Sequence, residues 1–412
     1  MDPSPLPERF ALRDRHVPKA RYVSSEFLAL ELDRVFSRVW HLAGPAADLD
    51  RTGAYFTFEI GSDSVLVVRQ ADGVRAFHNV CTHRGRALRE PGIGHARTFR
   101  CPYHRWEFAI DGALVDVPDA EAFAGCKARS ELGLRPVAAE IWEGFVWINL
   151  APNPEPLLDF LGPVAERLAA YRLEDYALEQ DQTLDIECNW KVGVDAFNEA
   201  YHLGSVHPQL LQMLDETRVA IELYGRHSCI RVPFGVASPN SAAPETVNDL
   251  LKYLLQEAGI NPSTFTGPAS AVRGAIQRTL RGRADFDLSR LTDDQITDNH
   301  QYYVFPNLTL NVYGMKHMLL RHRPHPTDPH RMLLDQQQYV RVPRGGKRPP
   351  RPKPERFLYG QGSLGFVTDQ DTFNLVRVQR GMRSRGFDEL VLGTAESRLL
   401  HMHQVIDEYL AR

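Results

Sequence analysis

Cys81-Thr82-His83, followed after 17 residues by Cys101-Pro102-Tyr103-His104, decides the fold of the N-terminal part of this 412-residue chain. Each of the two short segments offers one thiol and one imidazole. Two thiolates on one iron and two imidazoles on the other are the donor set of a mixed-ligand [2Fe–2S] cluster. Zinc sites usually pair Cys with Cys and His with His over short spacings, so zinc is the weaker interpretation. The sequence therefore predicts a cluster that passes single electrons, with Cys81, His83, Cys101 and His104 as its ligands.

Short strands and turns surround these two segments. Apolar and β-branched residues alternate or cluster in runs that we interpret as strands: 39–42, 54–60, 64–70, 74–79 and 140–150. Asp72-Gly73 and Asp111-Gly112 are dipeptides typical of hairpin turns. We expect an all-β domain over residues 40–155. Residues 1–39 are expected to form an N-terminal helical segment on a second domain, with a helix over 24–37.

Composition and charge limit the class of protein. An apolar content of 43% over 412 residues is enough for two cores, and a net charge of −4 gives no reason to expect a nucleic-acid partner. No apolar run reaches the ~18–20 residues of a membrane span. We see no secretory signal, and Cys126, Cys188 and Cys229 are scattered. A reducing cytoplasm is the expected location.

Residues 156–412 have a different texture from the β domain. Helical patterns cover 157–171, 244–258 and 394–411, and strand patterns cover 183–188 and 302–313. Because strands and helices do not alternate regularly, we expect an α+β domain with an antiparallel sheet. Residues 341–356 hold seven Lys or Arg, five Pro and one Glu. We interpret this stretch as a surface loop or linker, with docking of an acidic redox partner as the alternative.

A second group of candidate metal ligands lies between Asp195 and His207. On a helix, Glu199 and His202 share a face, and Pro208 should end the helix near His207. Two histidines held close together supply two corners of the facial triad of non-haem Fe(II) oxygenases, which a carboxylate completes. Alone the pattern is weakly specific. It gains weight in a chain with a cluster motif, because single electrons need an acceptor.

Together these motifs resemble the catalytic α subunit of the Rieske non-haem iron oxygenases, also called aromatic-ring-hydroxylating oxygenases. Asn189-Trp190-Lys191 matches the start of the family's catalytic helix, and Glu199-Ala200-Tyr201-His202 with His207-Pro208 matches its iron-binding segment. Gln370-Asp371 through Gly381 is similar to the segment whose Asp is the third iron ligand. The resemblance therefore assigns His202, His207 and Asp371 to mononuclear iron. Gln370 replaces the family's Glu, and Asp369 is the rival carboxylate.

The resemblance implies a Rieske β domain joined to a helix-grip catalytic domain, in which helices cover an antiparallel sheet. It implies a head-to-tail homotrimer, and a β subunit can accompany it. Glu199 occupies the position of the family's bridge between a cluster histidine and an iron histidine, here His104 and His202. A ferredoxin or flavin reductase would supply the electrons, because the sequence has no flavin or NAD motif of its own. The glycine pattern Gly360 to Gly365 lacks the context of a dinucleotide site.

The expected function is that of a terminal oxygenase that uses O2 to hydroxylate a mainly hydrophobic substrate. We expect the substrate to be aromatic or cyclic, as in aromatic hydrocarbon catabolism, with mono- and cis-dihydroxylation both open. Oxidative N- or O-demethylation is the alternative reaction, and a Rieske electron carrier or a structural zinc protein are the alternatives from other classes. Asp195, Phe197, Leu203 and residues 305–311 are expected to line the pocket, with Asp195 and Glu199 as catalytic residues. His401 and His403 are expected at the surface.

Overall fold

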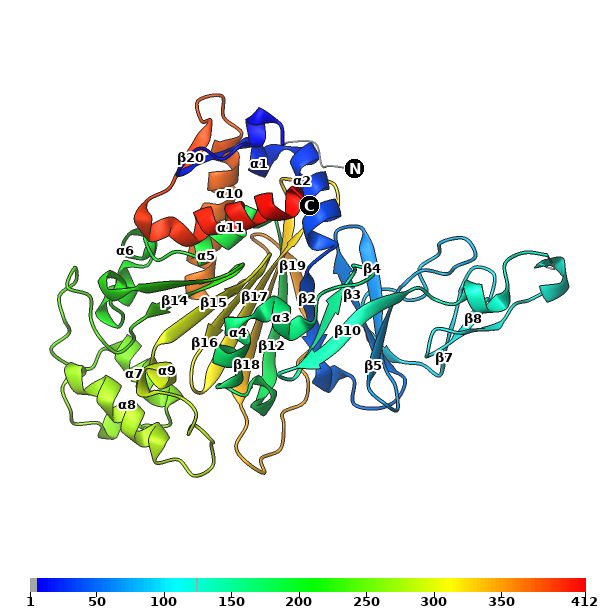
Figure 1. The fold of residues 1–412 in the computed structure, drawn as a ribbon. Coiled ribbons are helices and arrows are strands. Elements are labelled where there is room, and N and C mark those ends of the chain that lie inside the picture. The colour runs from blue at the N-terminus through cyan, green and yellow to red at the C-terminus, as the bar shows by residue number, and fades with distance from the viewer. Residues whose placement is uncertain (1–5, 124) are drawn as a thin grey trace. The chain divides into compact units, whose positions relative to one another are not determined.

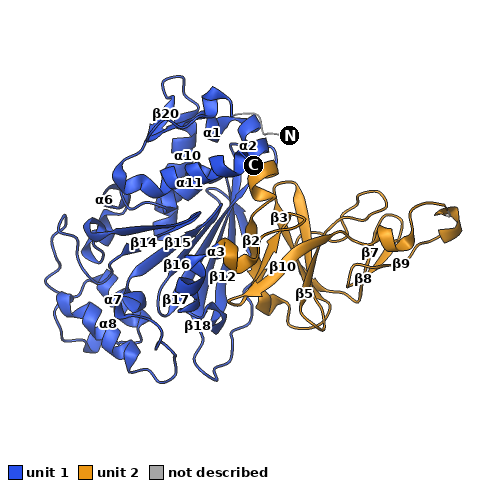
Figure 2. Cartoon of the chain, viewed as in Figure 1, with its two compact units in different colours: residues 1–31, 161–412 blue, residues 32–160 orange. Residues whose placement is uncertain are grey.

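The computed structural model describes residues 6–123 and 125–412, which form two compact units (Figure 1). Figure 2 shows the first unit, residues 1–31 with 161–412, in blue, and the second unit, residues 32–160, in orange. The helix expected over 24–37 is α2 (Ser25–Glu31), which continues into a π-helical turn at Leu32–Phe36. None of the helices described is long and apolar enough to cross a membrane.

The second unit is built from antiparallel strands. Its larger sheet has the order β2-β11-β10-β5-β4-β3-β6, and a smaller sheet has the order β7-β8-β9. The strands of the larger sheet are β2 (Trp40–Pro45), β3 (Ala54–Ile60), β4 (Asp63–Arg69), β5 (Val74–His78), β6 (Ile93–His95), β10 (Pro136–Trp142) and β11 (Phe145–Asn149). The smaller sheet contains β7 (Thr98–Arg100), β8 (Glu107–Ala109) and β9 (Leu114–Asp116). Alternate residues of β3 are buried, as expected for a strand with one face on a core.

The single strand expected over 140–150 is two strands. A hairpin turn at Glu143-Gly144 separates β10 from β11, and both turn residues have positive φ, 48° and 75°. Two left-handed residues in succession make the tight turn that matches the twist of the paired strands. Glutamate is a poor signal for that conformation, so the turn was missed from the sequence.

The first unit is built on an eight-stranded sheet of order β13-β14-β15-β16-β17-β18-β12-β19. All neighbours are antiparallel except β12 and β19, which are parallel. The strands are β12 (Tyr176–Ile186), β13 (Ala220–Tyr224), β14 (His227–Val232), β15 (Asn299–Val304), β16 (Leu308–Val312), β17 (Lys316–Pro324), β18 (Met332–Arg341) and β19 (Glu355–Leu358). A two-stranded sheet pairs β1 (His16–Pro18) with β20 (Glu389–Val391).

Helices cover this sheet. The α-helices are α1 (Ala20–Val23), α2, α4 (Pro163–Ala169), α5 (Trp190–Phe197), α6 (Leu203–Val206), α7 (Asp249–Glu257), α8 (Val272–Arg281), α9 (Asp293–Thr297), α10 (Phe366–Met382) and α11 (Ser397–Leu410), with α3 (Leu157–Leu161) at the unit boundary. Helix α5 packs against β16, β17, β18 and α10. The expected α+β class, an all-β domain plus a helix-covered antiparallel sheet, is confirmed. Two elements expected to be continuous are broken at prolines: 157–171 at Gly162-Pro163, and 302–313 at Pro306.

The basic stretch at 341–356 is irregular between β18 and β19, and most of its side chains after Arg341 are exposed. Arg344 pairs with Asp287, Arg351 with Asp181, and Arg348 donates to backbone carbonyl groups. Part of its positive charge is therefore neutralised within the chain.

Candidate metal centres

Two loops of the second unit carry the predicted cluster ligands, and the backbone of each loop makes the same pattern of hydrogen bonds. In the first loop, the Cys81 carbonyl accepts from Gly85 N–H, and Cys81 N–H donates to the Arg86 carbonyl. In the second loop, Cys101 makes the same pair of hydrogen bonds with Arg105 and Trp106. Gly85 and Arg105 both have positive φ, 77° and 61°. Each loop thus turns tightly enough to present its cysteine and histidine on one side.

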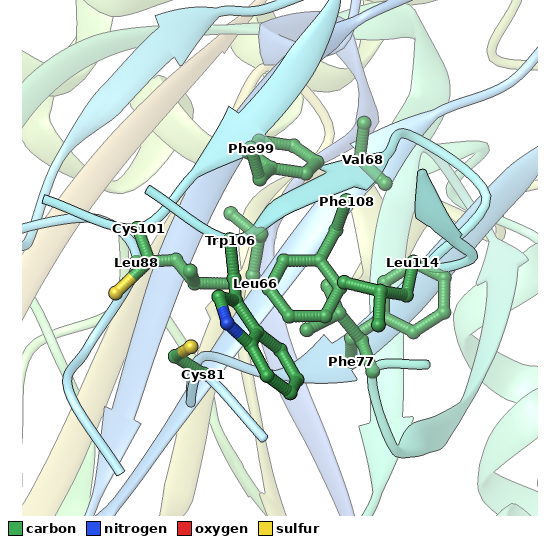
Figure 3. Close-up of a cluster of buried hydrophobic side chains, with 11 residues drawn as sticks. Leu66, Val68, Phe77, Cys81, Leu88, Phe99, Cys101, Trp106, Phe108 and Leu114 are labelled. Carbon is green, nitrogen blue, oxygen red and sulfur yellow. The ribbon is translucent and has the colours of Figure 1, made fainter. Parts of the chain in front are cut away.

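Figure 3 shows the sulfur atoms of Cys81 and Cys101 at one margin of a buried apolar cluster, on the side away from Phe77 and Leu114. Burial raises the pKa of the Cys81 thiol to about 11, partly offset by hydrogen bonds from the backbone of His83 and Arg84. Metal binding deprotonates such thiols, because the thiolate is the ligand.

The two cluster-loop histidines lie next to each other, with ring centroids 4.8 Å apart. His83 stacks on Trp106 at a centroid separation of 4.8 Å and an interplanar angle of 7°. Burial, His104 and Arg84 lower the pKa of His83, so its imidazole stays neutral, as a metal ligand requires. Its Nδ1 atom is buried and has no hydrogen-bond partner among the described residues. A buried ring nitrogen without a hydrogen-bond partner, in a loop that also offers a thiol, fits the donor set of a mixed-ligand cluster.

The second candidate centre is in the first unit and brings together His202, His207 and Asp371. One ligand atom from each lies within 4.8 Å of the others. Asp371 Oδ1 lies 2.8 Å from His207 Nε2 and 3.6 Å from His202 Nε2. His202 and His207 flank the short helix α6, and Asp371 comes from α10, which is buried at this position.

The hydrogen bonds behind each imidazole fix its tautomer. His207 Nδ1 donates to Gln370 Oε1 at 2.9 Å, and His202 Nδ1 donates to Glu199 Oε1. The Nε2 atoms of both rings face the Asp371 carboxylate, and His207 Nε2 lies within hydrogen-bonding distance of its Oδ1. A metal cation can replace a proton shared at such a position, because imidazole nitrogen and carboxylate oxygen are both metal ligands. Two imidazoles and one carboxylate fit mononuclear non-haem iron.

Glu199 reaches His202 in a way that the sequence did not predict. Helix α5 ends at Phe197, so Glu199 and His202 do not share a helix face. Instead the Glu199 carboxylate accepts from the backbone N–H groups of Tyr201 and His202 as well as from the His202 ring. Burial alone would lower the pKa of His202, but the Glu199 and Asp371 carboxylates raise it above its ordinary value. As expected, the polypeptide leaves the helix before Pro208.

The carboxylates and amides of α10 have separate roles. Asp369, the rival ligand, accepts from Leu364 N–H at 2.9 Å and from the Ser363 hydroxyl, so it caps the start of the helix. Gln370, which replaces the family's Glu, orients His207 and is held by Gln209 Nε2 at 2.7 Å and Val206 O at 3.0 Å. A metal-binding histidine needs a hydrogen-bond acceptor for its other ring nitrogen, and Gln370 is that acceptor for His207 Nδ1.

Asp195 lies near the end of α5, where its Oδ2 accepts from the Tyr22 hydroxyl at 2.7 Å. It is not among the converging ligand atoms. His403, expected at the surface, is fully buried and contacts the same hydroxyl, with Nε2 2.8 Å from it. The prediction for His403 was wrong because its side of α11 packs inward.

Comparison with known families identifies the domain that contains each site. Residues 39–131 match the Rieske [2Fe–2S] domain, and residues 173–412 match the catalytic domain of the ring-hydroxylating α subunit. The chain belongs to the ring-hydroxylating α-subunit family of Rieske oxygenases, which are oxidoreductases. Its two cofactors are a Rieske [2Fe–2S] cluster and mononuclear iron.

The curated relatives with similar sequences include oxygenase subunits of monooxygenases. Over 206 residues the chain is 32% identical to the oxygenase subunit of glycine betaine monooxygenase from Pseudomonas aeruginosa, covering 48% of this chain and 46% of the relative. It is 32% identical over 242 residues to the oxygenase subunit of carnitine monooxygenase from Escherichia coli, covering 57% and 63%. The chain thus spans about half the length of the curated relatives it matches.

Solved structures with the same fold cover nearly the whole chain. The quaternary ammonium Rieske monooxygenase CntA in complex with L-carnitine has a TM-score of 0.70 at 21% identity, covering 98% of this chain and 99% of that one. Naphthalene 1,2-dioxygenase with indole in its active site has the same TM-score and identity, covering 98% and 94%. At these identities the likeness shows the fold alone.

Proposed function

We propose that this chain is the terminal oxygenase component of a monooxygenase that acts on a quaternary ammonium compound. It would use O2 and electrons from a separate reductase or ferredoxin. The observation that carries the proposal is the convergence of His202, His207 and Asp371 in a chain that also has a Rieske domain. The substrate class is taken from the curated relatives, which act on glycine betaine, carnitine and choline. They do not support the expected aromatic hydrocarbon.

The role of the residues around the triad follows from their hydrogen bonds. When bound, the cluster supplies single electrons and the ferrous iron supplies activation of O2. Glu199 and Gln370 hold the protons of the two imidazoles at Nδ1 and so keep both Nε2 lone pairs free. Three protein ligands leave further positions open. Burial of His207 and Asp371 keeps bulk water from that side.

We further propose a head-to-tail homotrimer in which Glu199 of one copy meets His104 of the next. Large apolar side chains around the triad support this proposal, because they are exposed in the single chain: Tyr201 is 76% exposed, Phe366 70% and Phe373 50%. On the cluster side, Tyr103 is 55% exposed, and its ring contacts that of His104 at a centroid separation of 3.7 Å and a tilt of 35°. Contact between copies would cover both groups.

Hydroxylation of an uncharged hydrophobic substrate is the second candidate. It is favoured by an apolar cluster next to the triad, comprising Ala200, Leu211, Leu214, Ile230 and Val232, with Leu203, Leu210, Val219, Ile221 and Phe234 against it. Apolar side chains of this kind, where they border a substrate site, suit an apolar ligand and also the methyl groups of a quaternary ammonium ion.

The test uses the purified chain with iron and cluster restored and a surrogate reductase. Glycine betaine, carnitine and choline are offered beside naphthalene and indole, and products are identified by mass. Hydroxylation next to the charged nitrogen would break the carbon–nitrogen bond and release an amine and an aldehyde. Turnover of the aromatic compounds alone would refute the substrate assignment.

Paired variants of α10 test the centre itself. Asp371→Asn should lose mononuclear iron and coupled oxygen uptake while keeping the visible absorbance of the cluster. Asp369→Asn is the matched control, because Asp369 only caps the helix. Equal activity in the two variants would refute the assigned triad, and an electron carrier would become the better interpretation.

A further inference from the structure

A chain of buried polar side chains links α1, α11 and α5, and it reaches α5 at Asp195, four residues before Glu199. It runs from Arg21 on α1 to His403 on α11, back to Tyr22 on α1 and from there to Asp195 on α5, and Figure 1 shows these helices beside one another. The side chains of Arg21, Tyr22 and His403 are no more than 1% exposed. The Asp407 carboxylate binds Arg21 through both oxygens, at 2.5 and 2.7 Å. None of these hydrogen bonds involves His202, His207 or Asp371.

The direction of the hydrogen bonds in this chain is determined. Arg21 Nη1 lies 3.5 Å from His403 Nδ1 and can only donate, so the His403 proton is on Nε2. Nε2–H then donates to the Tyr22 oxygen at 2.8 Å, and the Tyr22 hydroxyl donates to Asp195 Oδ2 at 2.7 Å. Oδ2 is thereby held as an acceptor. A proton bound by Asp195 must reside on Oδ1, which is buried and has no hydrogen-bond partner among the residues described.

Burial and the neighbouring charges act in opposite directions on the protonation of the Asp195 carboxyl. Burial raises the pKa of Asp195 to about 7, against the lowering effect of the Tyr22 hydroxyl and the Lys191 ammonium. Burial also lowers the pKa of His403 and raises that of Tyr22, so both stay neutral. The charged or titratable groups that interact with Asp195 are Tyr22, Lys191, Glu199, Tyr303 and Glu396. Arg21, Glu31 and His403 in turn surround Tyr22 and Lys191.

We propose that Asp195 is a positioning residue that holds an exchangeable proton at Oδ1, and that loss of this proton puts the turn carrying Glu199 and His202 into its active arrangement. An ionised carboxylate accepts a stronger hydrogen bond from Tyr22 than a neutral one does. It therefore ties the end of α5 to α1, and the polypeptide reaches Glu199 four residues later. A buried carboxylate that costs stability when ionised is more typical of a functional site than of a core.

The kinetic part of this inference rests on the proposed function, but its main test does not. Infrared spectroscopy of the metal-free protein follows the stretch of a protonated carboxyl from about pH 5 to about pH 9. The wild type should lose one buried band with a midpoint near pH 7, and Asp195→Asn should lack that band. Tyr22→Phe keeps the carboxyl and removes a bond that favours ionisation, so its midpoint should move to higher pH. Tyr303→Phe is the matched control, because this buried hydroxyl donates to Pro306 O instead.

In the holoenzyme, kcat should rise with pH through the same midpoint. Asp195→Asn should remove this inflection and lower kcat about tenfold at alkaline pH, the size of one lost charge-assisted bond. A wild-type spectrum without the titrating band, or a Tyr22→Phe midpoint identical to that of wild type, would overturn the inference even if Asp195→Asn fails to fold. A pH profile unchanged in Asp195→Asn would do the same. Absence of any activity with a normal infrared titration would count against the proposed function alone.

Discussion

Replacing Lys191 by Met should strongly destabilise the first unit, because it leaves the Glu31 carboxylate buried without its cation. Lys191 Nζ donates to both Glu31 oxygens, at 2.7 and 2.9 Å, and both side chains are 0% exposed. Trp190 Nε1, at 3.1 Å, would be the remaining donor to that carboxylate. Removing one partner of a buried pair typically costs about 3–5 kcal/mol. Burial already raises the pKa of Glu31, so the variant should be weakest at alkaline pH.

The assay is thermal unfolding followed by circular dichroism, at fixed protein concentration and pH. For a unit of this size, each kcal/mol shifts Tm by about 2–4 °C, so Lys191→Met should lower Tm by about 6–20 °C. The double variant Lys191→Met with Glu31→Met should recover most of the loss, because apolar replacement of a buried pair is often neutral.

Lys252→Met is the matched control. Lys252 pairs with Asp249 at 2.8 Å, but the two side chains are 48% and 96% exposed. Exposed pairs contribute about 0–1 kcal/mol, so this variant should melt within a few degrees of wild type. If Lys191→Met melts no lower than Lys252→Met, the buried pair does not hold α2 against α5.

Three further outcomes are expected. Cys81→Ser should abolish the visible absorbance of the cluster, whereas Cys126→Ser, at an exposed position, should keep it; equal spectra would refute the ligand assignment. Gly193→Ala should destabilise α5 by about 1–3 kcal/mol, because the new Cβ would lie 2.6 Å from two neighbouring side-chain atoms. Gly204→Ala is the control, because its Cβ would meet nothing within 4 Å. Urea unfolding measures the free energy of unfolding of both variants. The folded chain keeps the Asp195 proton up to about pH 7, whereas the unfolded chain loses it near the ordinary pKa of an aspartic acid, 3.8. As the pH rises from the lower to the higher of these two pKa values, the free energy of unfolding should therefore fall by up to about 4 kcal/mol. Asp195→Asn should remove that part of the slope, and an unchanged slope would show that Asp195 is not the titrating group.

Parts of the fold could be predicted because their signals are local. The limits of β3 follow from alternation over 54–60, and the α+β class follows from the change in texture near residue 155. The prediction of one strand over 140–150 failed because a single residue with an unusual conformation decided the outcome. Glu143 adopts φ 48° because the paired strands require a tight turn, although glutamate gives little sign of it.

The amino-acid sequence by itself determined which donor atoms this protein offers and which of them lie close along the chain. Thiols and imidazoles two or three residues apart stay near each other in almost any loop, so the metal site that they form can be predicted without knowing the fold. Only the tertiary structure decided which distant groups join them. Asp371 rather than Asp369 meets His207 across 164 positions because α10 turns that side chain inward and uses the other as a cap. Tyr22, Asp195 and His403 likewise meet only because three helices exclude water from one space, and that exclusion moves the carboxyl into the neutral pH range.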